Sequence, residues 1–385
     1  MEKKASRLTS VDAVRGAIMI IMALDHVRDF VHSTAGQFRP EDLARTSVPL
    51  FFTRWITHFC APVFMFYAGI SAYLWASRGR SRPELSRYLL TRGLWLIFLE
   101  LTVVRFGFFF NFDYSLVILL VFWALGWGMI ALAGLVYLPP RVLATLSVAA
   151  IVLHNAFDGV QGGALWKILH QVAPFRVAGH TFIPSYSLIP WVFVMAAGYC
   201  LGPVFRLDTQ TRRRILLRAG TAMTLAFVVI RASNLYGDPS RWSFQSSPVF
   251  TLLSFLNCTK YPPSLLFLLM TLGPVLLATA WNDRVRFSAD HPLIVFGRVP
   301  LFYFILHFWA IHLITALMLW LGHGSSALFH NGPPSMGGKI AGPYGYPLWV
   351  VYVFWMSLVV LLYPICRWFA LLKQRHRDWG WLTYC

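Results

Sequence analysis

The sequence predicts an all-α, polytopic membrane protein with about ten transmembrane helices and both termini in the cytoplasm. The first observation behind this prediction is composition, because 57% of the 385 residues are hydrophobic and only 12% are charged. Soluble domains contain about 25% charged residues. So much apolar surface cannot be hidden inside one soluble domain, which argues against a secreted enzyme, a disordered chain and a nucleic-acid-binding domain.

The second observation is the length of the apolar segments, since a membrane-spanning helix needs about 20 mostly apolar residues. We expect spans at 11–32, 49–76, 87–106, 115–137, 141–157, 182–203, 213–234, 262–281, 292–321 and 347–371. Lys3, Lys4 and Arg7 before the first span resemble the start of a signal peptide, but the run is too long and lacks a cleavage site. Pro139 and Pro140 separate the fourth span from the fifth. The sequence contains no internal repeat of fixed period, and residues 1–385 are expected to form a single domain.

The third observation is the distribution of cations. With alternating spans, the segments placed in the cytoplasm contain 20 Lys and Arg residues and those placed outside contain 7. This bias supports cytoplasmic termini and explains the net charge of +18 without a nucleic-acid partner. The five cysteines form no C-x-x-C pair and indicate nothing about redox chemistry.

Charged residues in the first span indicate function, because ionisable groups inside a membrane are costly and tend to face a cavity. Helical spacing places one stripe of side chains on a single face: Asp12, Arg15, Met19, Met22, His26 and Asp29. Arg15 and His26 are eleven residues apart, or about 16 Å along a helix. We expect Asp12 to pair with Arg15 near the cytoplasm. At the outer end, Asp25 and Arg28 flank His26, and Asp25 is expected to hold its tautomer.

Other spans contain further candidate site residues, each with a plain structural alternative. Arg54 and His58 lie one turn apart in the second span, where Pro62 interrupts the helix. Lys260 is expected to orient a substrate oxygen, or else only to extend toward the membrane surface. Glu100 and Arg105 are expected to satisfy each other.

The ninth span contains Arg298 on the cytoplasmic side and His307 in its middle. Arg298 is suited to an anionic cofactor, whereas His307 either binds substrate or is a structural histidine with hydrogen bonds. His307 and His312 are five residues apart and point in different directions, and no H-E-x-x-H motif is present, so we predict no metal site. Polar residues in the outer loops 154–181 and 322–346 either shape the mouth of a substrate site or merely connect helices.

Four segments resemble the heparan-α-glucosaminide N-acetyltransferase-like membrane proteins. They are 7–16 (RLTSVDAVRG), 62–69 (PVFMFYAG), 259–265 (TKYPPSL) and 297–303 (GRVPLFY). No single segment is specific, but their order is. The spacing of Arg15 and His26 also resembles the first span of the bacterial acyltransferase-three O-acetylases.

The chain departs from the lysosomal members of the first family at the histidine. Those members have an Asn in the place of His26, and their proposed active His lies eleven residues further on, where this chain has Gln37. His32 is the imidazole nearest to that place. The reaction class is therefore better supported than heparan as the acceptor.

The resemblance implies an acetyl-CoA-dependent N- or O-acetyltransferase that modifies a sugar or glycan acceptor outside the cytoplasm. His26, held by Asp25, would be the general base or acyl carrier; Arg15, Arg298 and Asp12 would bind the acyl-CoA donor; Arg28, His58, Lys260 and His307 would bind the acceptor. The expected partners are the lipid bilayer, the donor and the acceptor, with a homodimer as one possible assembly. We expect a multi-pass protein of a bacterial cytoplasmic membrane.

Two other functions are compatible with an apolar chain of this kind. A secondary transporter or permease for a small polar solute would also contain buried His and Arg residues. A purely structural membrane subunit would not explain the polar stripe of the first span.

Overall fold

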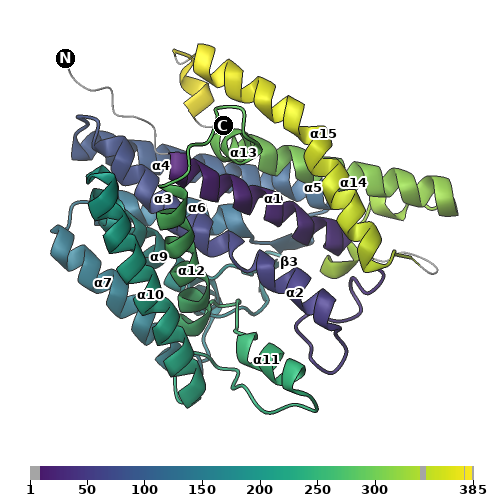
Figure 1. Cartoon of the computed structure of the whole chain (residues 1–385). Helices are drawn as coiled ribbons and strands as arrows, with labels where there is room; N and C mark the ends of the chain where they lie inside the picture. The colour runs from purple at the N-terminus through teal and green to yellow at the C-terminus, as the bar shows by residue number, and fades with distance from the viewer. Residues whose placement is uncertain (1–8, 339–343, 377, 384–385) are drawn as a thin grey trace.

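The computed structural model describes residues 9–338, 344–376 and 378–383, and over these residues the chain folds into a bundle of helices (Figure 1). The α-helices are α1 (Thr9–Val31), α2 (Val48–Thr57), α3 (Cys60–Ala76), α4 (Arg82–Leu99), α5 (Arg105–Phe109), α6 (Val121–Leu135), α7 (Pro140–Leu153), α8 (Ala164–Leu169), α9 (Leu188–Leu201), α10 (Thr209–Ser233), α11 (Pro248–Leu256), α12 (Leu265–Asn282), α13 (Pro292–Arg298), α14 (Pro300–His323) and α15 (Leu348–Arg375). A π-helical turn, η1 (Glu100–Val104), joins α4 to α5.

Short elements occupy the connections between the helices. The 3-10 turns are η2 (His154–Phe157), η3 (Gly202–Arg206), η4 (Ala327–Phe329), η5 (Pro334–Met336) and η6 (Gly380–Thr383). Three strands, β1 (Leu116–Ile118), β2 (Phe175–Val177) and β3 (His180–Ile183), form a small sheet in the order β1-β3-β2. In this sheet β1 runs parallel to β3, with Leu116 opposite Thr181, and β2 runs antiparallel to β3, with Phe175 opposite Phe182.

Seven helical segments of the described chain are long and apolar enough to cross a membrane. They are Val48–Ala76, Pro140–Phe157, Leu188–Arg206, Thr209–Ser233, Leu265–Asn282, Pro300–His323 and Leu348–Arg375. The other three segments expected to span the membrane coincide with α1, with α4 and η1, and with α6. The count of ten and the cytoplasmic termini therefore remain predictions.

Two of the expected spans differ in detail from the structure. The expected span 115–137 contains strand β1 near its start, so its helical part is limited to α6. Residues 292–321 form two helices, because α13 ends at Arg298 and Pro300 begins α14. Proline suits the first turn of a helix, where its missing N–H has no partner to lose.

Helix α1 runs through the middle of the bundle (Figure 1) and packs against α2, α3, α12, α13, α14 and α15. Its first half lies very close to α13. A Cβ added at Gly16 would lie 1.8 Å from the carbonyl oxygen of Leu293, and one added at Gly297 would lie 1.9 Å from that of Asp12. Only glycine permits this approach, which brings the Arg15 and Arg298 ends of the two helices together.

The end of α1 lies beside the start of α15. The backbone N–H of Tyr346 donates to the carbonyl of Val31, and that of Ser33 donates to the carbonyl of Tyr346. At its other end, α15 contacts the loop before α13, where Arg367 pairs with Asp290. The two helices therefore run in opposite directions.

Some sequence observations lie outside the described residues. Lys3, Lys4 and Arg7 precede them, as does the start of the motif 7–16, and Cys385 follows them. Among the described residues, Cys60, Cys200, Cys258 and Cys366 are free.

Candidate active site

A pair of imidazole rings joins α1 to α14. Nδ1 of His26 lies 2.8 Å from Nε2 of His307, and the two rings are nearly coplanar. The side chains of Phe108, Phe304 and Phe308 surround the His26 ring, with ring centroids 4.8–6.4 Å away. His26 therefore faces the protein interior, and His307 is fully buried.

The hydrogen bonds of the neutral pair determine its tautomers. Nδ1 of His307 lies 2.8 Å from the carbonyl oxygen of Tyr303, which can only accept, so this nitrogen holds the proton. Nε2 of a neutral His307 is then an acceptor, and Nδ1–H of His26 donates to it. The remaining nitrogen of His26, Nε2, has a free lone pair and no hydrogen-bond partner among the described residues.

Asp25 was expected to hold the tautomer of His26, but among the described residues no hydrogen bond joins its carboxylate to that ring. Its carboxylate accepts hydrogen bonds from Nη1 of Arg54, at 2.7 and 3.0 Å, and from the hydroxyl of Thr57, at 3.0 Å. Nη2 of Arg28 lies 2.8 Å from the same carboxylate and 2.7 Å from Asp29. Asp25 thus holds two guanidinium groups next to His26, while His307 sets the tautomer.

The polar cluster extends from α2 into the loop before it. Nε of Arg54 donates to Glu41 at 2.7 Å, and Nε2 of His58 lies 3.5 Å from the same Glu41 oxygen. Burial raises the pKa of the Glu41 carboxyl, but Arg54 and His58 together outweigh that effect and hold the pKa well below its usual range. The Asn257 side chain donates to the Glu41 backbone, at 2.9 Å, and so ties this loop to the segment before α12.

Lys260 lies in that segment and is buried. Its charge acts on Asp25, His26 and His58, so its ammonium group belongs to the same cluster. His26, Asp25, Arg28, His58, Lys260 and His307, all expected in the site, are therefore brought together at one end of α1.

The other three expected site residues lie toward the opposite end of α1. Nη1 of Arg15 lies 3.9 Å from Asp12, and Arg298 ends α13 beside them. Between the two ends of the stripe, Met19 and Met22 are only 1% and 4% exposed. The stripe of α1 thus links a basic end to the imidazole pair through buried methionines.

His32 and Gln37 lie away from the imidazole pair in the bonding network. Nδ1 of His32 contacts the Thr34 hydroxyl at 2.8 Å, and His32 pairs with Tyr346 in an isolated bridge. Gln37 is exposed on the loop and donates to the Ser33 carbonyl.

Two findings differ from what the sequence led us to expect. Glu41 and Thr57 complete the Asp25 and Arg54 cluster, and nothing in their local sequence distinguishes them. Glu100 and Arg105 were expected to pair, but Glu100 accepts from the N–H of Phe122 at the start of α6, and Arg105 donates to Asn111 and to the Asp113 carbonyl.

Comparison with known proteins supports a transferase. Residues 7–235 match the family described as heparan-alpha-glucosaminide N-acetyltransferase, catalytic. The match includes Asp25, His26 and His58, whereas Lys260, Arg298 and His307 lie beyond it. No curated protein matches the chain. Because the match covers more than half of the chain, the protein belongs to the heparan-alpha-glucosaminide N-acetyltransferase family of membrane acetyltransferases.

Proposed function

We propose that this protein transfers an acetyl group from cytoplasmic acetyl-CoA to an amine or hydroxyl of a sugar-type acceptor on the other side of the membrane. The observation that carries the proposal is the hydrogen bond from His26 to His307. It leaves Nε2 of His26 as an unprotonated nitrogen on a ring that phenylalanine side chains surround, beside two arginines.

In the proposed reaction, Nε2 of His26 takes the proton of the acceptor N–H or O–H as that atom attacks the thioester carbonyl. The new C–N or C–O bond forms, the C–S bond breaks, and the proton passes from His26 to the leaving thiolate. In the alternative route, Nε2 itself attacks the thioester, the C–S bond breaks and CoA leaves as a thiolate, so that the acetyl group is held on Nε2. The acceptor then attacks this acetyl group, the bond from Nε2 to the acetyl carbon breaks, and the acceptor's proton passes to the thiolate. His307 is a positioning residue in both routes.

The negative charge that develops on the carbonyl oxygen needs a hydrogen-bond donor. Nη1 of Arg28 is buried and has no hydrogen-bond partner among the described residues, whereas its Nη2 is held by Asp25 and Asp29. We assign Nη1 of Arg28 to this oxygen. Lys260 and His58 would orient the polar acceptor.

At the other end of α1, Arg15 and Arg298 suit the phosphates of the donor, because guanidinium groups match phosphate oxygens. Asp12, close to Arg15, would position that guanidinium group. The thioester would reach His26 along Met19 and Met22, whose flexible side chains can move aside.

Thermal unfolding of the detergent-solubilised chain tests the proposal. Acetyl-CoA at about 100 times its Kd should stabilise the protein by about 2.7 kcal/mol. The variants Arg15→Gln and Arg298→Gln should weaken this effect. No stabilisation by acetyl-CoA would contradict the proposal and favour the transporter alternative.

Turnover then distinguishes the two candidate histidines. With radiolabelled acetyl-CoA and glucosamine as the acceptor probe, His26→Ala should lower transfer by about 10²–10⁴-fold. His32→Ala is the matched control and should remain active. The reverse result would assign the reaction to His32, as the lysosomal relatives suggest.

A further inference from the structure

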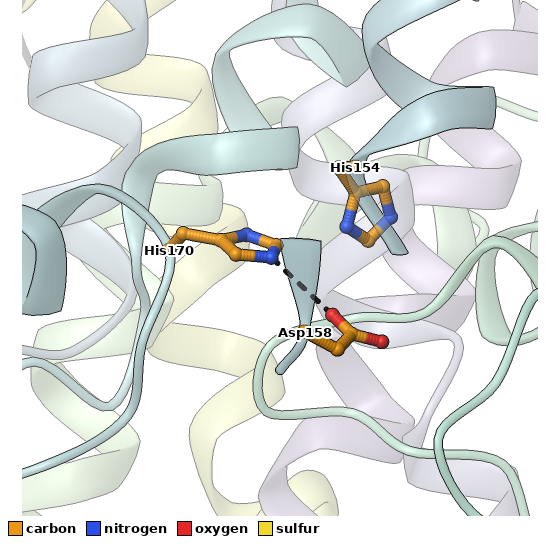
Figure 2. Close-up of side chains that lie close together, drawn as sticks. All are labelled: His154, Asp158 and His170. Atoms are coloured by element: carbon orange, nitrogen blue, oxygen red, sulfur yellow. Dashed lines mark ion pairs between the residues drawn. The ribbon is translucent and has the colours of Figure 1, made fainter. Parts of the chain in front are cut away.

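Three potential metal ligands lie together at the end of α7, away from the imidazole pair. Figure 2 shows His154 in η2, Asp158 directly after η2 and His170 directly after α8. One ligand atom of each residue lies within 4.8 Å of those of the other two. The first span of the chain contributes nothing to this cluster, so its role is separate from the proposed acetyl transfer.

The ligand atoms are buried and unsatisfied. His154 and His170 are only 4% and 3% exposed. Among the described residues, neither ring nitrogen of either histidine, nor Oδ1 of Asp158, has a hydrogen-bond partner. Each buried polar group without a partner costs about 1–3 kcal/mol of folding free energy, so even one such group is uncommon. Several in one place require an explanation.

The spacing of the atoms suits coordination rather than hydrogen bonding. Nε2 of His170 lies 3.3 Å from Oδ1 of Asp158, yet the pair lacks hydrogen-bond geometry. Zn²⁺ binds His nitrogen and carboxylate oxygen at about 2.0–2.2 Å, so two ligands on a tetrahedral ion lie about 3.4 Å apart. The ring centroids of His154 and His170 are 5.4 Å apart.

A second layer of hydrogen bonds orients the carboxylate. The side-chain N–H of Asn155 donates to Oδ2 of Asp158 at 2.8 Å, which leaves Oδ1 for His170 and an ion. The side-chain oxygen of Asn155 accepts from the backbone N–H of Leu265, at the start of α12. Metal-binding carboxylates are commonly held in this way.

We propose that His154, Asp158 and His170 bind a divalent transition-metal ion, with Zn²⁺ favoured by two imidazoles and one carboxylate. A water molecule would complete the four ligands. The ion would fix α8 against the end of α7 and, through Asn155, against the start of α12. This proposal departs from the prediction that the chain has no metal site, which rested on the spacing of His307 and His312 and on the absence of an H-E-x-x-H motif.

Zinc content tests the proposal. The full chain is purified in detergent without a polyhistidine tag, stripped with EDTA, equilibrated with micromolar ZnCl2 and freed of excess metal. We expect about one zinc per chain in the unmodified protein. His154→Gln, Asp158→Asn and His170→Gln should each lose most of it, and His323→Gln, a change at an exposed histidine outside the cluster, should keep it.

Two further measurements keep the test decisive if a variant fails to fold. Co²⁺ in place of Zn²⁺ should give the intense visible absorption of a four-coordinate site in the unmodified protein. Zn²⁺ should also raise the Tm of the unmodified chain and of His323→Gln. Less than about a tenth of a zinc per chain, or equal zinc in the cluster variants, would overturn the proposal.

Discussion

His26 and His307 are 281 residues apart in the chain, yet their ring nitrogens lie 2.8 Å apart and make one hydrogen-bonded unit. The Tyr303 carbonyl, four residues before His307, fixes the proton positions of both rings. This relay gives a neutral His26 a free Nε2, which is what a base or acyl carrier requires.

The first prediction concerns His307 as a positioning residue. His307→Phe preserves an aromatic ring but removes the acceptor of Nδ1–H of His26, so His26 is free to adopt the other tautomer. We expect kcat to fall by about 10–100-fold, the loss seen when partners that orient metal-binding histidines are removed, with little change in KM for acetyl-CoA.

The matched control for His307 is His312→Phe, in the same helix. His312 contacts the carbonyls of Gly107 and Leu328 and not His26, so its loss should affect Tm more than kcat. Equal kcat values for His307→Phe and the unmodified protein would contradict the positioning role.

The sequence predicts one half of this site well and the other half poorly. The stripe of α1 is periodic and charged, so Arg15 and His26 stand out against an apolar background. Three features depend on how distant segments pack, which local sequence does not reveal. They are the pairing of His26 with His307, the contact of Glu41 with Arg54, and the cluster around His154. The short sheet and the break at Pro300 were missed because apolar runs look alike in strands and in helices.

A second prediction concerns the buried charges around Asp25. Asp25→Asn leaves Arg28 and Arg54 without their shared carboxylate, and breaking such a buried pair costs about 3–5 kcal/mol of folding free energy. We expect a large drop in Tm in detergent. Asp290→Asn, which removes the exposed pair with Arg367, should change Tm much less. Similar drops for both variants would show that the Asp25 cluster is not buried as described.

A third prediction gives the pH dependence of the Glu41 contact. Despite burial, Arg54 and His58 together lower the pKa of Glu41 in the folded state, relative to about 4.3 in an unfolded chain. Its ion pair therefore stabilises the protein fully above about pH 4.3, and the stabilisation is lost as the pH falls through the folded pKa. The difference in Tm between the unmodified protein and Glu41→Gln should stay constant from neutral pH to about pH 5 and shrink below about pH 4. Asp42→Asn, in the same loop, serves as the control. A difference that grows as the pH falls would contradict the assignment.

The last prediction tests the path between the two ends of α1. Met19 and Met22 are buried along the stripe, so in the proposed reaction the donor would reach His26 only when they move. Met22→Trp should block the path and lower kcat by at least about tenfold, while Arg15 and Arg298 still bind the nucleotide and acetyl-CoA still raises Tm. Met22→Leu, of similar volume, should stay within about twofold of the unmodified rate. Overpacking by the tryptophan should cost about 1–3 kcal/mol of folding free energy, which the Tm without ligand measures separately. Full turnover in a folded Met22→Trp protein would mean that the thioester reaches His26 by another route. A tryptophan at this position is too large to leave a path along the stripe open.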